Sequence, residues 1–142
     1  MSESPQRHDY PHLQPILTRW QDSDLNGFIA GATVYAYFDT TIQGFLQLHA
    51  GLDLQDGEVM GFVVSSAADF FALPAFPDTL EVGLRVARLA GSSVEYQVAL
   101  FKAGEVQACA AGKVVQVFVE RASGRPVALP EGLQAALVRL QG

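Results

Sequence analysis

Residues 32–50, ATVYAYFDTTIQGFLQLHA, carry the one long helical pattern of this chain. Apolar side chains recur there at steps of three and four residues and end in a histidine: Val34, Phe38, Ile42, Phe45, Leu46 and His49. Gly51 follows as a suitable C-terminal stop. The pattern predicts one amphipathic helix, about 28 Å long, that buries a single face.

The segments around this helix have the patterns of strands. Residues 61–71 are apolar or small on both faces, whereas residues 79–88 alternate between apolar and polar side chains. Tight turns at residues 90–92 and 103–104 join residues 79–88, 93–101 and 106–119 into an antiparallel meander. A short strand at residues 15–20 comes before the helix, and a short closing helix at residues 131–140 ends the chain.

One amphipathic helix cannot cover a flat five-stranded sheet and leave a sealed core, but a curved sheet can wrap around it. We therefore predict an α+β fold in which a five-stranded antiparallel sheet curves around one long central helix, with a short C-terminal helix. Residues 1–14 are polar and without periodicity, so we expect a flexible N-terminal arm before a domain at residues 15–142. The two-faced apolar strand at residues 61–71 needs a cover, and a second copy of the chain would supply it.

Composition excludes several classes of function. The net charge is −6 and the nine Lys and Arg residues are scattered, which argues against nucleic-acid binding but allows a small anionic ligand. No apolar run approaches the roughly 18 residues of a membrane helix. The first residues lack an apolar signal region, and the single Cys109 suits a buried, reduced thiol, so we expect a cytoplasmic protein. No metal or other cofactor is expected, since no set of ligands has transition-metal spacing.

Three stretches of the sequence carry a resemblance to a known family. They are TRWQDSDLNGFIAGATVYAYFDT (residues 18–40), DFFALPAFPDTLEVGLRVARLAGSSVEYQVALFKAGE (69–105) and VVQVFVERASGRPVALPEGL (114–133). Their order and spacing resemble the 4-hydroxybenzoyl-CoA thioesterase-like hotdog proteins over residues 15–137. The resemblance implies a hotdog fold, assembly as a homodimer or homotetramer, and hydrolysis of acyl-CoA thioesters to free acid and coenzyme A.

The same resemblance implies roles for particular residues. Asp24 falls where the family carries its catalytic carboxylate, which acts as nucleophile or general base. Gly31 falls where a backbone N–H at a helix N-terminus polarises the thioester carbonyl. Gly27 and Phe28 belong to the same substrate-binding loop. The family's H-V-N-N run is replaced here by residues 28–31, FIAG, which leaves the substrate open.

The chemistry of this loop can be argued without the resemblance. Thioester hydrolysis needs a nucleophile or base, and donors for the oxyanion; a loop carboxylate followed by a helix start supplies both. Asp24 has an alternative interpretation as a turn residue that caps nearby N–H groups. Asp22 is interpreted as a loop-structuring residue. The run from Asp22 to Gly27 also fits the start of a calcium-binding loop, but its twelfth position is Thr33 instead of Glu, so we expect no calcium site.

Four further residues are candidate substrate contacts. Ser65 and Ser66 interrupt an apolar strand and are predicted to line the pocket, although small residues under a closely packed helix would explain them equally well. The predicted hairpin turn from Arg88 to Ser93 resembles a region that family members often use near the nucleotide, so the resemblance makes Arg88 and Ser92 candidate contacts to coenzyme A. An ordinary solvated hairpin is their alternative.

Two other functions remain open beside the acyl-CoA thioesterase. A non-catalytic module that binds acyl-CoA or an acyl chain is one of them. A dehydratase or hydratase is the other, but such chemistry usually pairs an Asp with a His, and His49 lies far from Asp24 along the helix. The acyl group and its carrier, coenzyme A or acyl carrier protein, are left open, as is the choice between dimer and tetramer.

Overall fold

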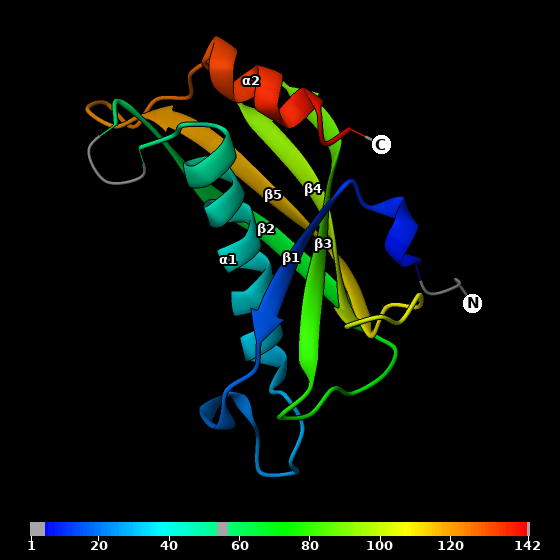
Figure 1. Ribbon diagram of the computed structural model, residues 1–142. Helices are drawn as coiled ribbons and strands as arrows, with labels where there is room; N and C mark the ends of the chain where they lie inside the picture. Colours follow the sequence, from blue (N-terminus) through cyan, green and yellow to red (C-terminus); the bar gives the residue numbers. More distant parts are fainter. Residues whose placement is uncertain (1–4, 54–56, 142) are drawn as a thin grey trace.

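The computed structural model describes residues 5–53 and 57–141. Within them lie five strands, two α-helices and two short 3-10 turns (Figure 1). The strands are β1 (His12–Leu17), β2 (Val59–Phe70), β3 (Thr79–Ala90), β4 (Ser93–Lys102) and β5 (Ala110–Glu120). The helices are α1 (Gly31–His49) and α2 (Glu131–Val138), and the 3-10 turns are η1 (Arg7–Asp9) and η2 (Trp20–Asp22).

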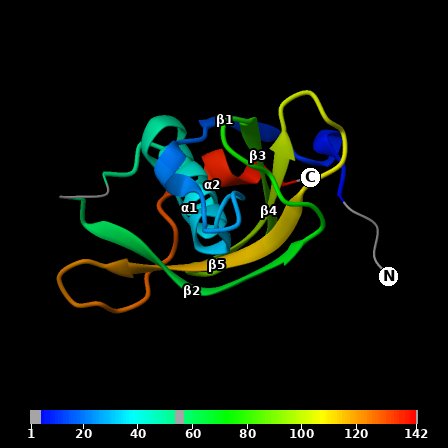
Figure 2. The ribbon, with the colours of Figure 1, turned by 90° about the horizontal axis from the view of Figure 1, so that it is seen from below.

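The strands form one antiparallel sheet in the order β1-β3-β4-β5-β2. Figure 2 shows the sheet curving around α1, with α2 on the same side. The predicted stripe of α1 is the buried face of the helix: Val34, Tyr37, Phe38, Thr41, Ile42, Phe45 and Leu46. His49, which the periodicity placed on that stripe, is exposed at the end of the helix, with its ring near those of His12 and Phe45. The predicted hotdog fold is confirmed.

The sealed core lies between α1 and strands β3 and β4. Alternate residues of these strands face the helix and are fully buried: Leu80, Val82, Leu84, Val94, Tyr96, Val98 and Leu100. Burial of each large apolar side chain contributes about 1.5–3 kcal/mol, so this half of the sheet supplies most of the stability. Tight turns at Gly91 and Gly104 hold β3, β4 and the chain leading to β5 in the predicted meander.

Strand β2 is an edge strand that pairs with β5 alone. Its register with β5 places Gly61, Val63, Ser66, Ala68 and Phe70 on the face toward α1, with a bulge between Val63 and Ser65. Few of its side chains are covered: Val63 is 40% exposed and Val64 is 53% exposed. Strand β2, which is apolar or small on both faces, therefore has an unpaired edge and exposed apolar side chains within one protomer.

The N-terminal segment differs from its expected form. The predicted strand at residues 15–20 begins earlier, because β1 spans His12–Leu17 and residues 20–22 turn as η2. Residues 5–11 of the expected flexible arm pack on the sheet: Arg7 forms an ion pair with Glu81 at 2.9 Å, and Tyr10 is buried. The remaining part of the arm, residues 1–4, lies outside the described residues. An ion pair with a distant strand leaves no periodic pattern, so the sequence gives no local sign of this packing.

The same segment explains why β5 starts at Ala110 and not at residue 106. Backbone groups of residues 106 and 108 bond to the N-terminal segment, with Arg7 N donating to Val106 O at 2.8 Å and Ala108 N to Pro5 O at 3.0 Å.

Cys109 is buried, as predicted, and burial raises the pKa of its thiol. In the described residues neither helix has both the length and the apolar character needed to cross a membrane.

Candidate active site

Asp22 anchors the loop that joins β1 to α1. Its carboxylate is 2% exposed and accepts hydrogen bonds from the Tyr37 hydroxyl at 2.7 Å and from Arg19, through the backbone N–H at 3.0 Å and Nη2 at 3.0 Å. The Asp22 carbonyl accepts from Ala30 N at 3.0 Å, just before the helix. The interpretation of Asp22 as a loop-structuring residue is confirmed, and its partner Tyr37 comes from α1 itself.

These contacts fix the charges of the network. Burial raises the pKa of Asp22, but the hydrogen bonds from Tyr37 and Arg19 outweigh it and hold the pKa below its usual value. Burial and the neighbouring Asp22 raise the pKa of Tyr37 above its usual value. Asp22 is therefore a carboxylate and Tyr37 a donor. Both oxygens of Asp22 accept hydrogen bonds from protein donors. Asp22 is therefore not free to serve as the first calcium ligand of the calcium-binding motif.

Asp24 lies exposed in the loop, which closes as a narrow hairpin. Its N–H donates to Phe28 O at 2.7 Å, and its Oδ1 accepts from Asn26 N at 2.9 Å and Phe28 N at 3.2 Å. Gly27 takes the positive φ of 86° that this turn requires. Asp24 therefore has the capping geometry of its alternative interpretation. Its second oxygen, Oδ2, accepts no hydrogen bond within the described part of the chain.

Gly31 is the first residue of α1 and is exposed. Ala30 precedes it as a cap without a side-chain hydrogen bond, and its carbonyl accepts from Thr33 and Val34. The N–H groups of Gly31 and Ala32 have no acceptor among the described residues. A Cβ at Gly31 would meet Phe70 Cζ at 3.8 Å, an ordinary contact. The missing side chain thus leaves an open approach to two free donors at the positive end of the helix dipole.

A groove of about 410 Å³ runs between α1 and β2, beginning one turn beyond Gly31. Its walls are Tyr35, Asp39 and Gln43 from α1, Phe62, Val63 and Ser66 from β2, and Val114 from β5. This volume lies within the range of small-molecule sites. Of the two predicted serines, Ser66 lines the groove, whereas Ser65 lies opposite Val115 and does not. Residues 35, 39 and 43 of α1 were not predicted to line the groove, although their four-residue spacing places them on one face of the helix.

The remaining predicted residues lie at different distances from the helix start. Phe28 is 38% exposed beside Asp24 in the loop. Arg88, exposed, and Ser92, half-buried, lie at the opposite end of the sheet. Arg88 lies nine positions along β3 from Thr79, which pairs with Leu17 near the loop, a span of about 30 Å. One protomer therefore does not bring Arg88 and Ser92 together with Asp24 and Gly31.

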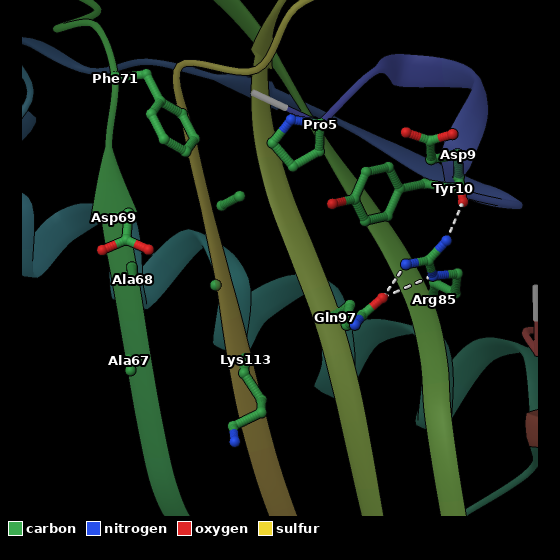
Figure 3. Close-up of a pocket in the computed structure, with 12 residues that line it drawn as sticks. Pro5, Asp9, Tyr10, Ala67, Ala68, Asp69, Phe71, Arg85, Gln97 and Lys113 are labelled. Atoms are coloured by element: carbon green, nitrogen blue, oxygen red, sulfur yellow. Dashed lines mark hydrogen bonds between the residues drawn. The ribbon is translucent and has the colours of Figure 1, made fainter. Parts of the chain in front are cut away.

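A second hollow lies on the outer face of the sheet, away from α1 (Figure 3). Its rim includes Tyr10 and Phe71, and its floor consists of small residues of β2 and β5. The Arg85 side chain there donates to Gln97 Oε1 from Nε and Nη2 and to the Asp9 carbonyl from Nη1, so each of its three nitrogens has an acceptor. Residues 5–53 and 57–141 contain no cluster of three His, Cys, Asp or Glu side chains that could hold a metal ion.

The family model of the thioesterase-like superfamily matches residues 18–137. This match includes the loop, the helix start and the groove just described. The chain belongs to the thioesterase-like superfamily, and this membership supports thioester hydrolysis as its general activity. No curated protein matches the chain.

Solved structures agree with this assignment. The chain is 55% identical to the PA5185 protein from Pseudomonas aeruginosa strain PAO1, covering 98% of this chain and 97% of that one with a TM-score of 0.96. The dynemicin thioesterase is 24% identical, with coverage of 92% and 96% and a TM-score of 0.84. Slr0204, a 1,4-dihydroxy-2-naphthoyl-CoA thioesterase from Synechocystis, is 19% identical, with coverage of 89% and 94% and a TM-score of 0.80. The two more distant structures share the fold.

Proposed function

We propose that this protein hydrolyses acyl-CoA thioesters to a free acid and coenzyme A. The observation that carries the proposal is the start of α1 at Gly31, which has no side chain and no side-chain cap, follows a loop with an exposed carboxylate and lies at the head of a groove. Preorganised N–H donors stabilise the oxyanion that forms when a thioester carbonyl is attacked. Family membership and the 1,4-dihydroxy-2-naphthoyl-CoA thioesterase activity of Slr0204 support the choice of a CoA thioester.

Asp24 is the proposed catalytic carboxylate. As a general base, its free Oδ2 takes a proton from water while the water oxygen bonds to the carbonyl carbon. The oxyanion accepts hydrogen bonds from the N–H groups of Gly31 and Ala32, and its collapse expels the thiolate of coenzyme A, which is then protonated. As a nucleophile, Oδ2 attacks the carbonyl carbon, the C–S bond breaks and the thiolate of coenzyme A leaves, and water then cleaves the mixed anhydride. Single-turnover hydrolysis in heavy-oxygen water separates the two routes. The general-base route places one heavy oxygen in the released acid, whereas attack of water on the Asp24 carbonyl of the anhydride places the heavy oxygen in Asp24.

A second copy of the chain completes the proposed site. The open edge of β2 is suited to pairing with its two-fold-related copy. In such a dimer the Phe70 end of one β2 lies beside the Val59 end of the other. The β3–β4 hairpin, which reaches the Val59 end of its own sheet, would then bring Arg88 and Ser92 of one protomer to the Asp24 end of the other. The proposed role of these two residues in binding coenzyme A therefore depends on assembly.

A non-catalytic acyl-CoA binding module is the second candidate. The Oδ1 of Asp24 accepts two loop N–H groups, as a purely structural turn residue would. The dehydratase alternative is weaker, since His49 lies 18 residues along α1 from Gly31, about 27 Å away.

Thiol release from acyl-CoA thioesters of graded chain length tests the proposal. Asp24→Asn keeps the acceptor oxygen for the loop but removes the base, so the rate should fall by about 10²- to 10⁴-fold with the fold intact by circular dichroism. Gly31→Val should also lower the rate, since its branches crowd the N–H donors. Asp69→Asn, an exposed carboxylate of β2 outside the groove, should leave the rate unchanged. If wild type binds acyl-CoA without releasing thiol, the binding module replaces the thioesterase.

A further inference from the structure

A pair of polar side chains lies inside the otherwise apolar core. Tyr96 of β4 and Gln116 of β5 are each 0% exposed, and the Tyr96 hydroxyl donates to Gln116 Oε1 at 2.7 Å. In the sequence, Gln116 interrupts the apolar run VVQVFV at residues 114–119. The amide oxygen of Gln116 takes part in this hydrogen bond, but the amide nitrogen does not.

Gln116 Nε2 is a buried donor that has no hydrogen-bond partner among the described residues. Ser23 Oγ shares this property, but a hydroxyl can rotate toward another acceptor. The Gln116 amide cannot, because Tyr96 holds its oxygen and thereby fixes the direction of its nitrogen. An unpaired buried donor costs the free energy of its lost hydration, so a protein that keeps one is expected to supply an acceptor from outside the chain.

The fixed nitrogen points toward β2, the strand that forms one wall of the groove. A Cβ on Gly61 would lie 2.9 Å from Gln116 Nε2 and 2.7 Å from Phe118 Cε1, so the backbone of β2 approaches the nitrogen closely and only glycine fits there. Val63, paired with Gln116 in the register, lines the groove beside it, and so does Val114, the preceding inward residue of β5. The amide therefore lies next to the end of the groove that is remote from Gly31.

We infer that the groove takes long acyl chains bearing an oxygen near their far end, and that this oxygen accepts a hydrogen bond from Gln116 Nε2. The inference rests on the proposed function for the thioester end of the ligand. Ala110, opposite Phe70 beside Gly31, is six residues from Gln116 along β5, or about 20 Å, so only a long chain spans the distance. A hydroxyl or keto oxygen fits, whereas a carboxylate would be buried without a cation. Entry requires the half-exposed Val63 side chain to turn aside.

Matched pairs of ligands test the inference. Non-hydrolysable thioether analogues of hexadecanoyl-CoA and ω-hydroxyhexadecanoyl-CoA, and the corresponding dodecanoyl pair, are titrated into wild type by calorimetry. The hydroxylated member of at least one pair should bind about fivefold to tenfold more tightly, as one hydrogen bond between neutral groups provides. Equal affinity within both pairs would overturn the inference.

Three variants locate the origin of the preference. Gln116→Met keeps the length of the side chain without the donor, and should bind both members of a pair equally. Because it leaves the Tyr96 hydroxyl unpaired, the double variant Tyr96→Phe/Gln116→Met serves as the folding control and should also show no preference. Gly61→Ala should abolish the preference as well, since the new methyl group would lie too close to Gln116 Nε2 and the Phe118 ring and would force the amide to shift. A preference that survives Gln116→Met would assign the oxygen to another residue.

The same ligands keep the two proposals apart. Thiol release is measured in parallel with the hydrolysable thioesters of each pair. If the thioethers show the preference but no thioester is hydrolysed, the proposed catalysis fails and the polar contact stands. If the thioesters are hydrolysed while the thioethers show no preference, the proposed catalysis stands and the contact at Gln116 is wrong.

Discussion

The two halves of the sheet bury their residues very differently. On β3 and β4 the side chains facing α1 are fully buried, as at Val98 and Leu100, whereas on β2 the residues Phe62 to Val64 are 40% to 53% exposed. The strands have the same length within two residues and belong to the same sheet. The difference arises because α1 packs over β3 and β4 and leaves its other flank apart from β2.

The two halves of the sheet therefore differ in role: one contains the buried core, and the other contains the proposed site. The half under α1 behaves as an ordinary close-packed core, in which a lost methylene group is costly. The half beyond α1 holds the groove and the free strand edge, and the unpaired donor of Gln116 lies beside it. The proposed binding of an acyl chain requires uncovered apolar surface, and β2 exposes Phe62, Val63 and Val64 beside the groove.

The largest effect expected from this division comes from the same substitution in both halves. Phe38→Ala removes a ring that is 1% exposed from the buried face of α1, and should lower the free energy of unfolding by about 3–5 kcal/mol. Phe62→Ala removes one that is 45% exposed on β2, and should cost about 1 kcal/mol or less in the dissociated protomer. Urea unfolding at low protein concentration measures both. Similar losses in the free energy of unfolding for the two variants would contradict the difference in packing between the two halves of the sheet.

The anchor of the loop should give a smaller, pH-dependent effect. Asp22→Asn weakens the hydrogen bonds to Tyr37 and Arg19 and should cost about 2 kcal/mol near neutral pH. Because folding lowers the pKa of Asp22, its stabilisation is present above the usual carboxyl pKa of about 4 and is lost as the pH falls through the folded value. Melting temperatures of wild type and variant should therefore converge in acid. A gap that widened in acid would contradict the assigned charge state.

The free edge of β2 should respond to charge with little change in the protomer itself. Val64→Lys introduces an ammonium at a position that is 53% exposed, so protomer stability should change by less than about 0.5 kcal/mol. If β2 pairs with its two-fold copy, light scattering should show the mass of the wild-type assembly falling toward the 15.3 kDa of the chain. An unchanged assembly mass would place the interface elsewhere. The matched control is Val106→Lys, which is 54% exposed outside the strands.

The smallest expected effect is that of calcium. Arg19 and Tyr37 occupy the Asp22 oxygens, and backbone N–H groups occupy one oxygen of Asp24. A cation would have to displace these donors, so millimolar calcium should leave the melting temperature where magnesium leaves it. A rise of several degrees with calcium alone would show binding to the folded state.

The sequence alone determined the elements and their curvature. The stripe from Val34 to Leu46 predicted α1, the alternation at residues 79–88 predicted β3, and the two glycine turns predicted the meander. One helix and five strands then required a curved sheet. Two of the predicted site residues lie where the sequence placed them, Gly31 at the helix start and Ser66 in the wall of the groove, because a helix start and a polar break in an apolar strand are local features that a short window of sequence reveals.

Only the tertiary structure decided which distant residues meet. Tyr37 reaches Asp22 across 15 positions, Tyr96 reaches Gln116 across 20, and Arg7 reaches Glu81 across 74. Tertiary packing likewise left the β2 flank of α1 open as a groove and separated Arg88 from Asp24. Periodicity reports how each segment divides between core and solvent, but hydrogen bonds and ion pairs form between single atoms brought together by the whole chain, and they leave no repeat in the sequence.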